Sequence, residues 1–549
     1  MRRIRLLFLA TAIGVPLAAC SPAGKPIAND QAVAGGEGTI NLEQGWSAAV
    51  QQRAWFTSFG SRLIPTTWLH VLEQPGSSER FMGDAHLDAL GFLVESPTAA
   101  NPSGFPVGFT HEVDKDGRDW TGLGCATCHT GELRYQGHRI RLDGGQGNLD
   151  FDGFEAQLIA SLRATVSDAV VFARFADALA TAEDQRGALK QEVTALTDKL
   201  DTRHQMNRVD IPYGHARMDA FGQIFNAVAV QFLDRPDNRR APDAPVSFPV
   251  LWDAPHLDVV QWNGSAPNAG PGPLLQNITT ALAVYGSLDI NQRAGIDGYA
   301  SSINFAHLDQ IEDDLYALQA PQWPASIFGA LDAASVKRGE AIYAQQCVAC
   351  HQLSDRTEPK RELKAVLTPL DQVGTDPRMA QNFLDSVSDS AAFAGHKQGV
   401  VFGPTLDTRA QTSDLVVHAA VGAALGHPLE TVRNGIASFH EEIGSPLNSH
   451  PDGYKARPLS GIWSSAPYLH NGSVPTLVDL LKPSAERAKH FHVGSREFDV
   501  QAVGLADTDD AHSSAFDTSL PGNSNVGHLY GTTLLETDKR DLLEYLKSL

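Results

Sequence analysis

The chain has 549 residues, which is enough for two or three domains with cores of their own, and its formal net charge is −21. Such an acidic surface repels nucleic acid, so we expect no nucleic acid partner, and it suits a basic redox protein. No run of about 18 apolar residues follows the N-terminal region, so we expect no membrane-spanning helix in the mature chain.

The N-terminus has the pattern of an export signal, with three arginines in the first five residues and a short apolar stretch over residues 6–17. The stretch ends in Leu-Ala-Ala-Cys, which resembles a bacterial lipoprotein box in which Cys20 receives the lipid. Residues 1–20 are therefore predicted to be a lipoprotein signal peptide, with an ordinary secretory signal as the alternative. Because Ser21 and not Asp follows, we expect an exported, lipid-anchored chain on the outer membrane, facing the periplasm.

The remaining chain divides into a tether and two parts. Residues 21–42 are rich in Ala, Gly and Pro, which predicts a flexible tether. We expect an N-terminal domain over residues 43–321 and a C-terminal domain over residues 322–549, with a Pro-rich linker at their boundary.

Most of the expected elements are helices. Residues 151–204 carry long runs with helical periodicity and predict a helical hairpin, whereas residues 235–255 and 263–273 are rich in Pro and Gly and predict ordered loops. A helix over residues 335–346 leads into a cysteine pair, and Thr537 is the expected N-cap of a final helix. No clear strand series is seen, so the predicted fold is mainly α, with two cytochrome c-like domains, long loops and extra helices.

Four of the five cysteines form two C-x-x-C-H motifs, Cys125/Cys128/His129 and Cys347/Cys350/His351. Two residues between the cysteines let both sulfurs reach the vinyl groups on one edge of a haem, and the next residue then becomes the iron ligand. We therefore predict two covalently bound haem c groups, with His129 and His351 as proximal ligands.

Other uses of the four cysteines fit less well. Paired cysteines of a zinc ribbon lie roughly 15–20 residues apart, and these pairs are separated by most of a domain. A dithiol redox motif or two local disulfides would leave both histidines without a role.

The second axial ligand decides between an electron carrier and an enzyme, because Met and His close a haem for electron transfer. The C-terminal part has a single methionine, Met379, but many histidines. Among these, His470 lies in the run APYLHNGSVPTL and His528 in the run LPGNSNVGHLYG.

Several of these runs resemble the rubber oxygenase branch of the bacterial di-haem cytochrome c peroxidase superfamily. The similar segments are RPLSGIWSSAPYLHNGSVPTLVDLL, FHVGSREFD, FDTSLPGNSNVGH, GHARMDAFGQIFN and WDAPHLDVVQWNGS. The resemblance implies one haem per domain, with chemistry at the N-terminal haem and electron transfer at a bis-histidine C-terminal haem. Carried over by motif context, the distal ligand of the second haem is His528, with His470 as the alternative.

The resemblance implies an oxidoreductase whose N-terminal haem activates dioxygen or peroxide. Trp252, His256 and Trp262 are candidates for lining its distal pocket, although they suit loop packing equally well. The alternative is a non-catalytic electron carrier in which Met206, Met218 or His256 closes the first haem. Rubber oxygenases are secreted freely and are longer, so the polyisoprene substrate is not carried over. We expect an unknown organic substrate and a small redox protein or small oxidant as partners.

Overall fold

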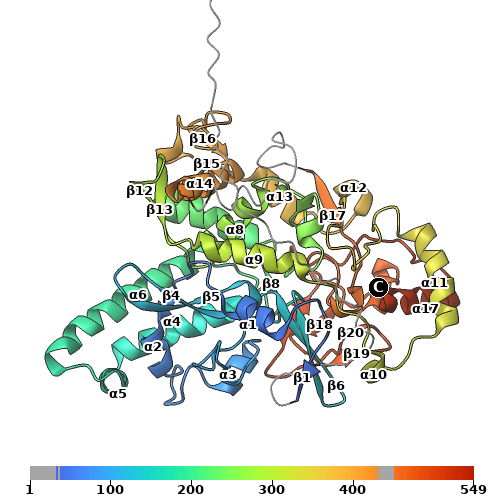
Figure 1. The fold of residues 1–549 in the computed structure, drawn as a ribbon, viewed down its shortest axis with the longest axis horizontal. Coiled ribbons are helices and arrows are strands. Elements are labelled where there is room, and N and C mark those ends of the chain that lie inside the picture. The colour runs from blue at the N-terminus through green and yellow to red at the C-terminus, as the bar shows by residue number, and fades with distance from the viewer. Residues whose placement is uncertain (1–32, 35–37, 430, 432–450) are drawn as a thin grey trace, which may run out of the picture. The chain divides into compact units, whose positions relative to one another are not determined.

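The computed structural model describes residues 33–34, 38–429, 431 and 451–549 (Figure 1). The predicted signal peptide and Cys20 lie outside the described residues, as does most of the predicted tether. Residues from Ala32 to Leu549 fall into one unit by their contacts, so the boundary near residue 322 stays a prediction.

The fold is mixed α/β, which corrects the prediction of a mainly α protein. Helices account for 39% and strands for 17% of the residues, and the described residues hold 16 α-helices and several small sheets. The strands were missed because most are only two to five residues long, too short for an alternating pattern to stand out. One hairpin turns at Gln136 and Gly137, whose φ values of 49° and 83° are both positive, as a type I′ turn requires.

Two small sheets hold the first C-x-x-C-H motif. In one, β3 (Ile64–Pro65), β5 (Asp119–Leu123) and β4 (Phe109–Val113) pair antiparallel. The other has the order β1 (Val33–Ala34), β2 (Thr39–Asn41), β7 (His138–Asp143) and β6 (Thr130–Tyr135). The motif lies between β5 and β6, where η1 (Cys125–Thr127) forms a single turn, so both sheets fix its position.

Helices pack beside these sheets and around an apolar core (Figure 1). The expected hairpin over residues 151–204 is present as α4 (Phe151–Ser167) packed against α6 (Arg186–Met206), but its first arm is broken by a 100° bend, after which α5 (Ala169–Ala178) follows. A second helical layer consists of α8 (Gly272–Ala283), α9 (Phe305–Ala317) and α14 (Thr412–Gly426). Its core includes Leu274, Ile278, Leu308, Leu415 and Ala419, all almost fully buried.

A helix pair holds the second motif. Helix α11 (Ala333–Gln346) runs directly into Cys347 and packs against the final helix, α17 (Glu536–Ser548), as Figure 1 shows. The two backbones are so close that a Cβ atom on Gly339 would lie 2.0 Å from the carbonyl oxygen of Asp541. The predicted N-cap of the final helix is wrong, because Leu535 precedes its first turn and Thr537 lies inside that turn.

The other elements are short. The helices are α1 (Ala48–Phe56), α2 (Thr66–Val71), α3 (Asp84–Ala89), α7 (Ala220–Asn226), α10 (Ala325–Phe328), α12 (Leu370–Val373), α13 (Arg378–Asp385) and α16 (Leu477–Leu480). The single-turn or irregular helices are η2 (Glu183–Gln185), η3 (Ala227–Phe232), η4 (Pro236–Asn238), η5 (Ala254–His256), η6 (Ala391–Phe393), η7 (Ile462–Ser464) and η8 (Ser484–Glu486). The strand pairs are β8 (Arg217–Met218) with β9 (Val246–Ser247), β10 (Val259–Val260) with β11 (Ala266–Pro267), β12 (Leu288–Ala294) with β13 (Gly298–Ser301), β14 (Val366–Pro369) with β17 (Gly453–Ala456), β15 (Val387–Asp389) with β16 (Arg409–Gln411), β18 (His490–Val493) with β21 (Ser514–Asp517), and β19 (Phe498–Asp499) with β20 (Gly504–Leu505).

Within the described residues, no single helix is long and apolar enough to cross a membrane. Helices α4 and α5 reach that length and composition only when taken together, and the chain bends by 100° between them.

Candidate haem sites

The second motif forms a tight turn at the end of α11. The backbone N–H groups of Cys350 and His351 both donate to the carbonyl oxygen of Cys347, at 3.1 and 2.9 Å. The turn directs both thiols and the imidazole of His351 to one cavity, which we call the His351 cavity. Nδ1 of His351 lies 2.7 Å from the carbonyl oxygen of Arg457. Since a carbonyl only accepts, Nδ1 carries the proton and Nε2 is free to bind iron.

His528 lies across the His351 cavity from His351. The two ring centroids are 6.2 Å apart, which leaves room for one metal ion at about 2 Å from a nitrogen of each ring. Burial lowers the pKa of His528 to about 4, so its imidazole is neutral and able to bind a metal. Its Nδ1 is buried and has no hydrogen-bond partner among the described residues. The position of His528 therefore fits the second axial ligand of a haem held at His351.

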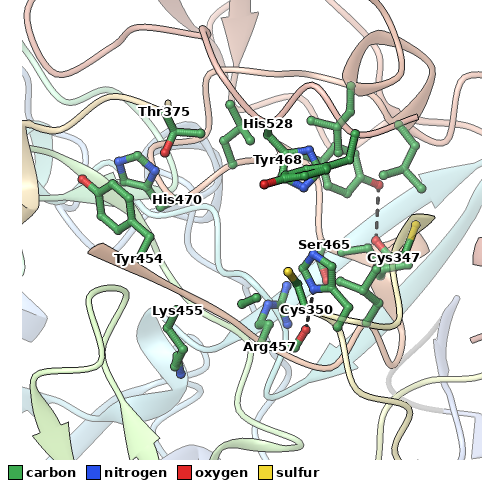
Figure 2. Close-up of a pocket in the computed structure, with 18 of the residues that line it drawn as sticks. Cys347, Cys350, Thr375, Tyr454, Lys455, Arg457, Ser465, Tyr468, His470 and His528 are labelled. Atoms are coloured by element: carbon green, nitrogen blue, oxygen red, sulfur yellow. Dashed lines mark hydrogen bonds between the residues drawn. The ribbon is translucent and has the colours of Figure 1, made fainter. Parts of the chain in front are cut away.

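His470 lines the same cavity in a different setting. Its ring stacks on Tyr454 with 4.0 Å between the centroids, and burial lowers its pKa to about 3. In Figure 2, His470 lies beside Tyr454 and Thr375, whereas His528 lies nearer to the two cysteines. Met379 packs with Tyr454 and does not line the cavity. Of the two histidines, His528 is the one whose ring faces that of His351 at 6.2 Å between the centroids.

The walls of the His351 cavity are mostly aliphatic and aromatic, as a porphyrin requires. The apolar side chains that line it include Phe248, Val250, Leu459, Ile462, Leu477, Leu481, Leu542 and Leu546.

Two cations line the wall that the His351 cavity shares with a neighbouring cavity. Burial lowers the pKa of Lys455, at the end of β17, to about 7, and that of Arg457 to about 10. Within the described part of the chain, neither side chain forms a salt bridge, and Lys455 Nζ reaches only the carbonyl oxygen of Val259, at 3.5 Å. Asp258 favours the charged form of Lys455 and Asp253 that of Arg457, but neither acid is in ion-pair contact with its cation. Desolvated cations without a contacting carboxylate are costly, so this wall fits a group that brings its own carboxylates, as haem does. Neither residue stands out in its local sequence, because only long-range packing brings it to this wall.

The first motif is built by the same means. The N–H of His129 donates to the carbonyl oxygen of Cys125 at 3.0 Å, and Nδ1 of His129 donates to the carbonyl oxygen of Pro249 at 2.8 Å. Burial lowers the pKa of His129 to about 4, so its ring is neutral with Nε2 free. Thr127 Oγ1 donates to the carbonyl oxygen of Gly108 at 2.9 Å and fixes the turn. Both motif histidines are thus oriented by a backbone carbonyl.

Two cavities lie next to the first motif. A small one, the His129 pocket, is lined by Cys125 and His129. A larger one, which we call the Glu312 cavity, shares Leu251 and Leu315 with that pocket and is also lined by Glu312. Among the described residues that line the two cavities, there is no methionine and no histidine besides His129.

The three predicted distal-pocket residues have different positions. Trp252 is fully buried, and its Nε1 donates to the carbonyl oxygen of Ser460 at 2.9 Å. His256 packs edge-on against Tyr316, with 5.5 Å between the centroids. Neither Trp252 nor His256 lines a cavity described above, and nor do Met206 and Met218. Trp262, however, lines both the His351 cavity and the Glu312 cavity.

Comparison with known proteins adds a family relationship. Residues 453–492 match the family described as RoxA-like, cytochrome c-like, and this segment includes Lys455, Arg457 and His470. The uncharacterized protein y4iJ of Sinorhizobium fredii is 30% identical over 577 residues, which span 92% of this chain and 93% of that protein. The uncharacterized protein y4iM of the same organism is 26% identical over 365 residues, covering 62% of this chain and 73% of that protein.

Proposed function

Since the chain belongs to the same family as y4iJ of Sinorhizobium fredii and carries a RoxA-like, cytochrome c-like domain, we propose that it is an exported di-haem c-type oxidoreductase. One haem is attached at Cys125 and Cys128, with His129 as its iron ligand. The other is attached at Cys347 and Cys350, and His351 and His528 are its two iron ligands.

The observation that carries the proposal is the difference between the two sites. A second imidazole, that of His528, lies across the cavity from His351, with 6.2 Å between the ring centroids. At the first motif, the lining residues that the structure describes offer no second histidine and no methionine. A haem with an open axial position binds dioxygen or peroxide, and one with two histidine ligands is suited to electron transfer. The first site is therefore the reactive one.

The chain's own residues prepare both sites for these roles. The carbonyl oxygens of Pro249 and Arg457 hold the Nδ1 protons of His129 and His351, so each ring keeps one tautomer and one orientation. The apolar lining of the His351 cavity excludes water, which favours electron transfer with little reorganisation of solvent. Lys455 and Arg457 place positive charge between the two cavities, where it balances the carboxylates of a bound haem.

The N-terminal sequence and the net charge indicate where the protein is located and which electron partner it uses. We infer a lipid anchor at Cys20 and a location on the outer membrane facing the periplasm, since the export pattern ends in a lipoprotein box. A net charge of −21 favours a small, basic redox protein as the electron partner. The substrate is an unknown organic molecule, and the oxidant is a small molecule such as dioxygen or peroxide.

Carbon monoxide binding to the reduced protein tests the division of roles. We expect one carbon monoxide to bind per chain, that is, per two haems, with a change in the spectrum of one haem only. His129→Ala, compared with Met379→Leu as a control outside both cavities, should abolish this binding. If neither haem binds carbon monoxide or dioxygen, the protein is an electron carrier and not an oxidoreductase.

A further inference from the structure

An acid group that the sequence analysis did not single out lines the cavity beside the first motif. Glu312 belongs to α9, and Gln276 and Asn277 of α8 line the same Glu312 cavity. Asn277 Nδ2 donates to Oε1 of Glu312 at 2.7 Å, which fixes the carboxyl group in the wall. Oε1 of Gln276 is buried without a hydrogen-bond partner among the described residues, so the same wall has an unused acceptor.

Glu312 is close to the first motif. Before haem attachment, burial and then the charge of Glu312 raise the pKa of the Cys125 thiol to about 11, so the carboxyl group lies close to that sulfur. Leu315, one turn further along α9, lines both the Glu312 cavity and the His129 pocket. Pro249, whose carbonyl oxygen holds His129, is part of the Glu312 cavity as well. The carboxyl group therefore lines a cavity that adjoins the His129 pocket through Leu251 and Leu315.

The surroundings of Glu312 suit proton transfer near neutral pH. Burial raises its pKa to about 7, the hydrogen bond from Asn277 opposes this, and Asp309 and Asp313 on the same helix add to it. A group that titrates near the working pH can both accept and donate a proton. Other titratable or charged groups near Glu312 are Tyr316, Asp253, Lys455 and Arg457, which line the cavity.

We propose that Glu312 is the proton acceptor and donor for the first site, positioned by Asn277, and that it serves a small ligand or oxidant that carries an exchangeable proton. This inference rests on the proposed function, in which the first site is open. The carboxylate takes the proton from the neutral ligand H–X, giving a carboxylic acid and the anion X⁻, and no electrons are exchanged in this step. The carboxylic acid returns the proton when the product leaves.

Hydrogen cyanide is a suitable probe, because it binds as the anion and must lose a proton. For the oxidised full-length holoprotein, we expect the cyanide association rate to rise with pH through an inflection near 7. Glu312→Gln should remove the inflection and slow association by roughly 10²-fold. Asn277→Leu should move the inflection to higher pH, since it removes a hydrogen bond to the charged carboxylate. Asp313→Asn, a neighbour outside the cavity, should keep the inflection at or slightly below its original position.

Thermal unfolding gives a readout that does not depend on ligand binding. The pKa of Glu312 is raised in the folded state, so the folded protein binds more protons than the unfolded chain between about pH 4.5 and 7. The contribution of Glu312 to the free energy of unfolding therefore falls as pH rises through that range. Glu312→Gln should therefore raise the Tm above pH 7 and leave it nearly unchanged at pH 4.5.

The outcomes separate the two claims. Cyanide binding with an inflection that persists in Glu312→Gln would refute the role of Glu312 while leaving the open first site intact; Lys455, whose pKa is also about 7, would then be the titrating group. Failure of cyanide to bind the wild-type protein in either redox state would overturn the open site itself, and the role of Glu312 with it.

Discussion

Among single substitutions, His528→Ala should show most clearly that the two haems have different axial ligands. In the folded protein, the His528 ring lies 6.2 Å from that of His351, and a methyl group at residue 528 cannot span that gap to a shared iron. The second haem should then lose one of its two ligands and change from low spin to high spin. The number of carbon monoxide molecules bound per chain should rise from one to two.

The backbone at His528 lets the variant fold. Its φ of 47° lies in the left-handed region, where Ala pays the same penalty as His, about 1–2 kcal/mol. The N–H of residue 528 can still donate to the carbonyl oxygen of Val373, at 2.8 Å in the wild type. His528→Gly relieves the strain at this φ and serves as a second variant.

The assay is carbon monoxide titration of the reduced variant, followed by its visible spectrum, beside His470→Gln and Met379→Leu. His470→Gln and Met379→Leu should keep a single binding site. A second binding site in His470→Gln, with the His528 variants unchanged, would make His470 the ligand. The same result in Met379→Leu would point to methionine ligation of the second haem.

Three further predictions follow from the rest of the chain. Intact mass and haem staining should show two covalent haems in the wild type and one in Cys125→Ala or Cys347→Ala. A wild-type mass that fits one haem or bound zinc would contradict the presence of two covalent haems. Cys20→Ala should release the protein from the membrane fraction, and continued association would argue against the lipid anchor. Gly339→Ala should lower the free energy of unfolding by roughly 2 kcal/mol, because its Cβ would lie 2.0 Å from a backbone oxygen of α17. Gly187→Ala, where the added Cβ meets open space, should change the free energy of unfolding by less than about 1 kcal/mol. Equal effects of the two substitutions would refute close packing of α11 on α17.

The parts of the sites that depend on local spacing could be predicted from the sequence. The C-x-x-C-H motifs fix which residues meet over one turn, and the structure does place His129 and His351 so that a backbone carbonyl orients each ring. The resemblance directed attention to His528, which is almost 180 positions further along the chain than His351 and could not be found by spacing alone.

Residues whose role depends on long-range burial escaped the sequence analysis. Lys455, Arg457 and Glu312 look like ordinary surface charges in their local runs, and only the packed chain brings them to cavity walls. Trp252 shows the reverse case: its aromatic run suggested a residue that lines a pocket, but its side chain is buried in a hydrophobic core. Of the fold, the helices within residues 151–204 and those beside the second motif were expected from their periodicity, whereas α8, α9 and α14 were not. The short strands depend on partners far away in the chain.

Electron paramagnetic resonance of the oxidised protein as isolated tests the central claim most directly, since spin state reports the axial ligands of each iron. The account predicts two signals of equal weight: a low-spin signal of a bis-imidazole haem, from His351 and His528, and a high-spin signal from the haem at His129. Two low-spin signals would show that both haems are closed and would contradict the proposed division between a reactive first site and an electron-transferring second one.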